Sequence, residues 1–433
     1  MKYADSLNEF ALAFDPDELG GDDINKFYYD GTMPIRMNDI YQSPMDDIFN
    51  SCLLVKHQNA HLLLGHRGCG KSTELNVLKR RFVESGRKVS VVQCLLEADI
   101  QGLTYWDLLI LMGKHLIMIA EEAECVLPQT LINNINDFWK DVEITTTKMN
   151  AIGLNTTAGA SINAPFKFPL INFFANLSGE LKYGYDKRKT IREKIKNNTG
   201  QWIGYMMEAA DYITTDLKGK QPIIIYEDLD KLSPEIAWDV FTNPLSQMPF
   251  PVIYTFPISL SYSPRFAQLE ATFSNNTHIL PMIKIRTPDA EIFQPGIQTI
   301  TNIIEKRGAL DLFDKDALSY LVEKTGGILR DLFNCITRAA DRACNRNAGK
   351  IEFEDAVAVT IQLRSMLTRR IEVKNYPLLR NISIDKKFKE NIEDREMMLN
   401  MMEGLIVLEY NGDRWHDLHP LVEDYLKKHG ELN

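Results

Sequence analysis

The chain has 433 residues, 45% of them hydrophobic and 25% charged, which is typical of a globular protein and long enough for about three domains. Its net charge of −10 argues against a protein whose main task is to coat nucleic acid, although a local basic patch is compatible with it. The six cysteines are scattered without paired metal-binding spacing, and the most apolar stretch, residues 108–120, is too short to span a bilayer. We therefore expect a cytoplasmic protein with free thiols.

A phosphate-loop signature follows a short apolar run at residues 61–64. Gly65 is separated by four residues from Gly70-Lys71-Ser72, and residues 72–85 have the apolar spacing of a helix. The glycines let successive N–H groups turn towards an anion at the positive end of that helix. Lys71 would neutralise the β- and γ-phosphates, and Ser72 would place its hydroxyl on Mg²⁺. The stretch predicts a site for ATP and Mg²⁺ formed by Gly65, His66, Arg67, Gly68, Cys69, Gly70, Lys71, Ser72 and Thr73.

A second motif, QPIIIYEDLDKL at residues 221–232, is a buried-strand pattern that ends in acids. One acid at such a strand end can hold Mg²⁺ through water, and a second can polarise the attacking water. We predict Glu227 as the metal-side acid and Asp228 as the base, with the reverse assignment left open. Asp230 follows in the same run without an assigned role.

The next predicted strand, residues 251–260, ends in the polar residues Thr255 and Ser259, and Arg265 lies beyond it. Thr255 could sense the γ-phosphate or orient water, or it could be a turn hydroxyl. Arg265 could reach a neighbouring subunit's phosphate, although a solvated surface arginine is favoured. Cys69 lies inside the loop and beside Lys71, a position that predicts a reactive thiol whose alkylation blocks nucleotide binding. The alternative is that Cys69 only fills a position that needs a small residue.

The sequence suggests four units, one of which carries an insertion. Residues 1–48 read as an extended arm, in which Ile35, Arg36, Met37 and Tyr41 could line an adenine or pack on the surface. Residues 49–287 form the P-loop ATPase domain, and residues 141–185 within it are predicted to be a β-rich insertion that favours partner contact. Residues 288–367 are predicted to be a helical lid. Residues 368–433 contain a helix, a two-stranded hairpin and a final helix, as in a winged helix.

The order of these landmarks resembles AAA+-type P-loop ATPases of the origin-recognition and STAND groups. The resemblance rests on LLLGHRGCGKSTEL, IIIYEDLDKL, VIYTFPISL and GGILRDL, and covers residues 35–433. It implies an α/β fold with a parallel P-loop sheet, a lid and a winged helix. It also implies that Arg330 touches the γ-phosphate from the lid. Glu227-Asp228 departs from the usual Asp-first pair and puts efficient turnover in doubt.

The function expected from these features is a slow ATPase that acts as a conformational or assembly switch for a separate effector protein, for example in a bacterial stress or defence system. A homo-oligomer fits the resemblance. Two alternatives are a DNA-binding ATPase like those of origin recognition and a nucleotide-locked scaffold with negligible turnover. Residues 401–433 carry three Lys/Arg against seven Asp/Glu, which disfavours DNA binding there. The basic stretch of Arg364, Arg369, Arg370 and Lys374 is read as a solvated helix.

Overall fold

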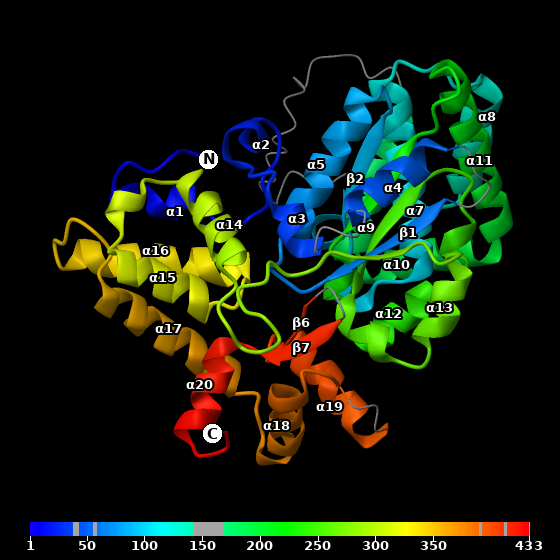
Figure 1. Cartoon of the computed structure of the whole chain (residues 1–433). Coiled ribbons are helices and arrows are strands. Elements are labelled where there is room, and N and C mark those ends of the chain that lie inside the picture. Colours follow the sequence, from blue (N-terminus) through cyan, green and yellow to red (C-terminus); the bar gives the residue numbers. More distant parts are fainter. Residues whose placement is uncertain (38–42, 55–58, 143–168, 389–391, 411–413, 433) are drawn as a thin grey trace.

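A parallel five-stranded sheet forms the centre of the computed structural model, which describes residues 1–433 except 38–42, 55–58, 143–168, 389–391, 411–413 and 433 (Figure 1). The strand order is β2-β3-β4-β1-β5. The strands are β1 (Ala60–Gly65), β2 (Val89–Gln93), β3 (Ile223–Glu227), β4 (Val252–Pro257) and β5 (Thr277–Ile279). Every residue of β1, β3 and β4 is buried, because parallel strands at the centre of a sheet are covered on both faces.

Helices cover both faces of this sheet, and alternate residues of β1 show how. Leu62 and Leu64 pack in one hydrophobic core with α7 (Tyr105–Glu122), whereas Leu63 packs in another with α4 (Pro44–Leu53) and α5 (Lys71–Glu84). Two shorter helices, α12 (Pro234–Phe241) and α13 (Phe266–Thr272), flank β4 in the sequence. The phosphate-loop helix α5 therefore packs against both the sheet and α4.

In its described residues, the segment between β2 and β3 forms helices joined by turns and contains no strand, so the predicted β-rich insertion is wrong for residues 169–185. It contains α6 (Cys94–Glu97), α7, α8 (Gln129–Trp139), α9 (Pro169–Tyr183), α10 (Tyr185–Asn197) and α11 (Thr199–Asp216). In α9, Leu170, Phe174, Leu177 and Leu181 follow a helical period and are all buried. The threonine-rich part of the predicted insertion, with Phe166 and Phe168, lies outside the described residues.

A helical lid follows the sheet and carries the N-terminal segment on it. The lid contains α14 (Gln294–Glu305), α15 (Lys315–Lys324), α16 (Leu329–Asn345) and α17 (Phe353–Thr368). The expected extended arm instead forms α1 (Phe10–Ala13), α2 (Asp22–Phe27) and α3 (Thr32–Met37). Phe10 and Phe14 are fully buried against Phe313 and Phe333 of the lid region. The arm folds because packing against the lid removes these apolar rings from water, which is favourable.

The C-terminal residues form a small unit below both the sheet domain and the lid in Figure 1. It consists of α18 (Tyr376–Asp385), α19 (Ile392–Glu403), the antiparallel strands β6 (Val407–Tyr410) and β7 (Trp415–Leu418), and α20 (Pro420–Lys428). This is the predicted order of helix, hairpin and helix, although the turn at Asn411-Gly412 lies outside the described residues. Among the helices that the structure describes, none has the length and apolarity needed to cross a membrane.

Candidate functional site

The phosphate loop joins β1 to α5 at the carboxyl edge of the sheet. Gly68 and Gly70 have φ values of +79° and +103°, in the left-handed region that favours glycine. A Cβ at Gly68 would lie 2.8 Å from the Cβ of Arg330 in the lid. The two glycines therefore give the loop its turn and also allow the lid to approach it closely.

Lys71 begins α5, and its ammonium is held entirely by the protein. Its Nζ donates to the carbonyl oxygens of Gly65 (2.7 Å) and His66 (3.0 Å) and lies 2.8 Å from a carboxylate oxygen of Asp230. Burial alone would raise the pKa of Asp230, but the charge and hydrogen bond of Lys71 outweigh it and hold that pKa below its usual value. Because an ammonium has three donors, a phosphate can bind Lys71 only by replacing one of these partners.

The acids at and just beyond the end of β3 occupy three different environments. Glu227 is 5% exposed, and one of its carboxylate oxygens is buried without a hydrogen-bond partner. Burial, together with the charges of Glu18, Asp228 and Asp230, raises the pKa of Glu227 to about 8. Only Asp230 of the acids in this run lines the same pocket as Lys71.

Asp228, the predicted base, has φ of +70° and its side chain is engaged on both oxygens. Oδ2 accepts from the N–H of Leu95 at 3.2 Å, and Oδ1 lies 2.7 Å from the ammonium of Lys231. Before it can polarise water at a bound phosphate, Asp228 has to leave these partners. The sequence analysis assigned no role to Asp230 and did not predict its ion pair with Lys71.

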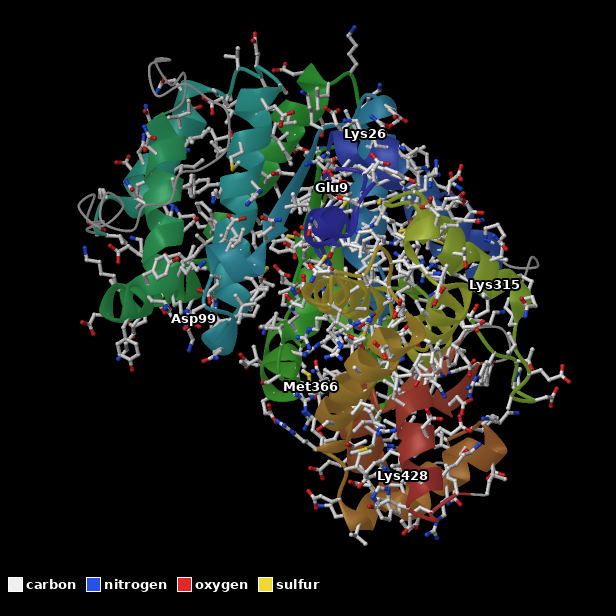
Figure 2. All side chains as sticks on the ribbon, turned by 90° about the vertical axis from the view of Figure 1, so that its left-hand side faces the viewer. Glu9, Lys26, Asp99, Lys315, Met366 and Lys428 are labelled. Carbon is white, nitrogen blue, oxygen red and sulfur yellow. The ribbon has the colours of Figure 1, made fainter. Side chains whose placement is uncertain are left out.

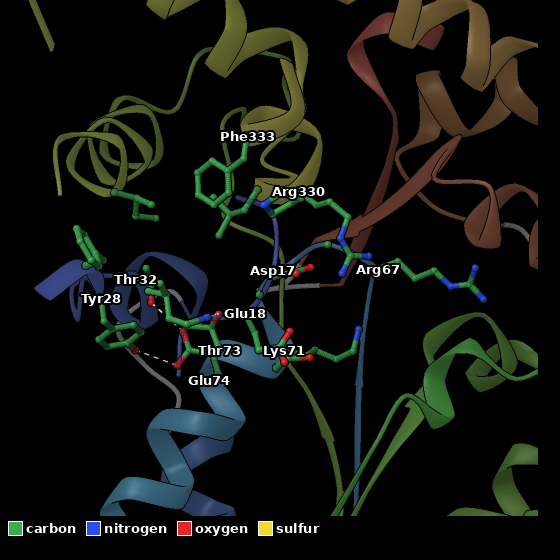
Figure 3. Close-up of a pocket in the computed structure, with 18 of the residues that line it drawn as sticks. Asp17, Glu18, Tyr28, Thr32, Arg67, Lys71, Thr73, Glu74, Arg330 and Phe333 are labelled. Carbon is green, nitrogen blue, oxygen red and sulfur yellow. Dashed lines mark hydrogen bonds between the residues drawn. The ribbon is translucent and has the colours of Figure 1, made fainter. Parts of the chain in front are cut away.

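A pocket of about 900 Å³, including its open mouth, lies over the loop (Figure 3). The N-terminal segment, the phosphate loop with α5, and the lid each contribute to its wall. Its lining includes Asp17, Glu18, Tyr28, Thr32, Arg36, Arg67, Lys71, Ser72, Thr73, Glu74, Asp230, Arg307, Arg330 and Phe333. Ser72 and Thr73 are thus placed in the pocket, as the phosphate-loop prediction requires.

The N-terminal helices brace the loop from one side. The guanidinium of Arg36, which is 1% exposed, donates to the carbonyl oxygen of Cys69 at 2.8 Å and also to that of Pro281. Tyr28 and Thr32 donate from their hydroxyls to the buried carboxylate of Glu74 at 2.9 and 3.4 Å (Figure 3). Burial raises the pKa of Glu74 although Arg36 opposes it. Of the four arm residues considered for lining an adenine, Arg36 lines this pocket, Ile35 and Met37 do not, and Tyr41 lies outside the described residues.

Residues 13–19 cross the pocket as a strap between the lid and α5. Arg307 of the lid region donates to the carbonyl oxygens of Ala13 and Asp15 at 3.3 and 3.0 Å. At the other end, the N–H of Leu19 donates to the Thr73 hydroxyl at 3.2 Å. Two exposed acids of the strap, Asp17 and Glu18, line the pocket. The strap was not predicted to be a part of the site.

The lid contributes Arg330 at the start of α16. Its main-chain N–H donates to the carbonyl oxygen of Gly68 at 3.3 Å, and its exposed side chain lines the pocket with that of Arg67 (Figure 3). The structure therefore brings Arg330, Lys71 and Ser72 to one cavity, as the resemblance implied. The contact of Arg330 with a γ-phosphate stays a prediction.

Other predicted residues lie outside this pocket. Thr255 is buried, accepts from the N–H of Leu229 at 3.0 Å and donates to the carbonyl oxygen of Tyr226 at 3.3 Å, so it ties β4 to the turn after β3. Arg265 is exposed at the start of α13. Cys69 is 1% exposed and packs in the core beside Gly65, which favours the small-residue interpretation, and the reactivity of its thiol stays a prediction.

The C-terminal hairpin contacts the phosphate loop through His66. The main-chain N–H of Glu409 in β6 donates to Nε2 of His66 at 2.8 Å. Burial, Lys71 and His416 together lower the pKa of His66 to about 3, so the ring is neutral and can accept. Nearby, the hydroxyl of Tyr262 bonds with Glu409 and His416. This contact was not predicted from the sequence, because its two partners are 343 positions apart in the chain.

Searches for relatives found similarity in structure only. No family model matches this chain, and no curated protein matches it in sequence. Among solved structures, the chain is similar to Cdc6p from Pyrobaculum aerophilum, with 12% identity, a TM-score of 0.43, and coverage of 97% of this chain and 98% of that one. It is also similar to the ORC2 protein of Aeropyrum pernix, with 11% identity, a TM-score of 0.39, and coverage of 96% and 98%. The Walker-type ATPase paby2304 of Pyrococcus abyssi shows 13% identity, a TM-score of 0.42, and coverage of 91% and 97%.

At these levels of similarity, the class of the protein rests on its own geometry. A glycine-rich loop leads from β1, an inner strand of a parallel sheet, into a helix that begins with Lys71 and Ser72, and acids stand at the end of β3, which β4 separates from β1. This arrangement defines the α/β fold of a P-loop NTPase, carrying a helical lid and a C-terminal unit with a hairpin.

Proposed function

We propose that this protein binds ATP with Mg²⁺ and hydrolyses it slowly, as a switch whose nucleotide state is passed to a partner effector. One observation carries the proposal: the phosphate loop is contacted both by the lid, at Gly68, and by the C-terminal hairpin, at His66. A loop that changes shape around a phosphate would change both contacts. The nucleotide state is thereby linked to the arrangement of three parts of the chain.

Phosphate binding begins with an exchange of partners at Lys71. The anion replaces the Asp230 carboxylate on the ammonium and meets the N–H groups of the loop, while Arg67 and Arg330 supply further positive charge from the pocket wall. Ser72 and an acid after β3 are the groups that would hold Mg²⁺, which would neutralise charge on the phosphates. The buried, unpartnered carboxyl oxygen of Glu227 fits such a role.

Slow turnover is proposed from the position of Asp228. The base has to give up the Leu95 N–H and the Lys231 ammonium before it can orient a water molecule. ATP can therefore persist in the pocket, which suits a switch better than a motor. An effector protein and self-assembly are the outputs that we propose for it.

The test of the switch is mass in solution, measured by light scattering with ATP, with ADP and without nucleotide, together with hydrogen exchange of β6 and β7. We expect ATP to change the assembly or to speed exchange in the hairpin, because the His66 contact is altered. The control is the variant Lys71→Ala/Asp230→Asn, in which neither change should follow ATP. If ATP binds and neither mass nor hairpin exchange changes, the switch is excluded and the nucleotide-locked scaffold is favoured.

Replacing the predicted base separates hydrolysis from binding. We expect Asp228→Asn to lower the hydrolysis rate by about a hundredfold or more, because a general base contributes roughly that much, while ATP affinity stays within about twofold. Phosphate release in single turnover and titration with a fluorescent ATP analogue would measure the two quantities. Glu227→Gln serves as the comparison. A loss of turnover in Glu227→Gln but not in Asp228→Asn would reverse the assignment of the two acids.

A further inference from the structure

The sequence from Lys182 to Lys196 is the most strongly basic part of the helical segment between β2 and β3. It carries seven Lys/Arg against two Asp/Glu, in a chain whose net charge is −10. Most of these residues belong to α10, which is labelled in Figure 1. None of them lines the nucleotide pocket, so the proposed ATPase function leaves this charge unexplained.

One face of α10 is buried and another borders a groove. Ile191 and Ile195 are fully buried, which fixes the helix on the core. Tyr185, Lys189, Arg192 and Lys196 follow the spacing i, i+4, i+7 and i+11, so they form a stripe about 16 Å long. With Trp106, Asp186, Arg188 and Glu193, this stripe lines a groove of about 810 Å³, including its open mouth.

Two of the basic side chains in the groove are held in place by acids beneath them. Arg192 donates from Nε to Asp107 at 2.9 Å, and Arg188 forms an ion pair with Asp99. Figure 2 shows Asp99 on the opposite side of the view from Lys315 of the lid, so the groove lies away from the lid. These paired arginines shape the wall, whereas Lys189 is exposed on it.

Aromatic rings accompany the charge. Tyr185 is 86% exposed at the first turn of α10, although a tyrosine normally buries most of its ring. Trp106 forms another wall, with the ammonium of Lys196 5.4 Å from the centre of its ring. Flat rings beside cations suit the bases and phosphates of a single strand, whereas an acidic peptide would use the cations and leave the rings unused.

We propose that this α10 groove binds single-stranded nucleic acid, with Lys189 and Lys196 on phosphates and Tyr185 stacked on a base. The carboxylates of Asp186 and Glu193 limit the positive charge of the groove, so the binding depends on both stacking and charge. This partner differs from a duplex docked on the C-terminal unit, whose residues 401–433 are acidic. The groove is also separate from the nucleotide pocket, since the two share no lining residue.

The test uses the full-length protein and a fluorescein-labelled 20-mer of dT, with fluorescence anisotropy measured over a range of salt concentrations. We expect Lys189→Glu/Lys196→Glu to weaken binding by at least about tenfold and to flatten the salt dependence of log K by about 1.4, the value for two lost phosphate contacts. Tyr185→Ala should weaken binding by about fivefold or more without changing the salt slope, because it removes stacking alone.

The matched control is Arg369→Glu/Arg370→Glu, which makes the same change in charge on another exposed basic stretch. It should bind the dT probe within about twofold of the wild type, and ATP titration should show that all these variants keep the nucleotide site. Loss of binding in the control but not in the α10 variants would overturn the proposal. Binding of poly-glutamate as tight as that of the dT probe, with no effect of Tyr185→Ala on either, would also overturn it in favour of an acidic peptide.

Discussion

Lys71→Ala should lower the stability of the folded protein, and adding Asp230→Asn should restore that stability without restoring ATP binding. The single change leaves the buried Asp230 carboxylate without the ammonium that now lies 2.8 Å away. Removing one partner of a buried ion pair costs about 3–5 kcal/mol, because the remaining charge stays desolvated. The amide in the double variant carries no charge, so most of that loss should be recovered, while the phosphate-binding ammonium is still missing.

Urea unfolding of the nucleotide-free protein and calorimetric titration with ATP would measure both effects. The control is Asp230→Asn alone, in which Lys71 keeps the carbonyl oxygens of Gly65 and His66. This variant should bind ATP at least as tightly as the wild type, because the carboxylate that competes with phosphate has gone. Equal instability of Lys71→Ala and of the double variant would show that the ion pair does not account for the loss.

Glu227→Gln should stabilise the nucleotide-free protein at pH 8.5 and have little effect at pH 4.5. The pKa of Glu227 is about 8 in the folded protein and near its ordinary value of 4.5 when unfolded. Between these values the folded state holds a proton that the unfolded state has released, so the stability of the wild type falls as pH rises through this window. Glutamine does not titrate, and its advantage in unfolding free energy should reach about 5 kcal/mol as an upper limit, from roughly 1.4 kcal/mol per pKa unit.

Urea unfolding at pH 4.5, 6.5 and 8.5 tests this prediction without nucleotide or metal. Glu305→Gln, a change at an exposed position of α14, is the matched control and should show no such pH-dependent gain. If Glu227→Gln is destabilising at every pH, the prediction is wrong and the carboxyl group makes a stabilising contact that glutamine cannot replace.

Local patterns in the sequence were enough to predict the sheet and the loop. A buried parallel strand is a continuous apolar run, and the phosphate loop needs glycines at set spacing, so both can be read from a few adjacent residues. The helix α9 was missed although Leu170, Phe174, Leu177 and Leu181 are helically spaced, because Phe173 and nearby threonines suggested strands. The N-terminal helices were missed for a different reason: Phe10 and Phe14 are buried only by the lid, about 300 residues further along the chain.

The sequence predicted the phosphate-binding residues of the pocket but not the other segments that line it. Lys71, Ser72 and Arg330 line one pocket, as expected. The role of Asp228 could not be read from its neighbours, because the left-handed φ of +70° turns its carboxylate to Leu95 and Lys231 and leaves Asp230 facing Lys71. The strap and the hairpin come from opposite ends of the chain, and no local pattern marks their approach to the loop.

The contact between the hairpin and His66 uses the main chain of Glu409. Every amino acid except proline supplies that N–H, so almost any side chain at position 409 is compatible with the bond. The bond is instead sensitive to the pairing of Glu409 with His416, since a slip of one residue in a β-ladder turns each side chain to the other face and moves the N–H groups with it. Insertions or deletions in the hairpin should therefore disturb this contact more than substitutions do, and related chains could differ widely in residues here while keeping the same coupling.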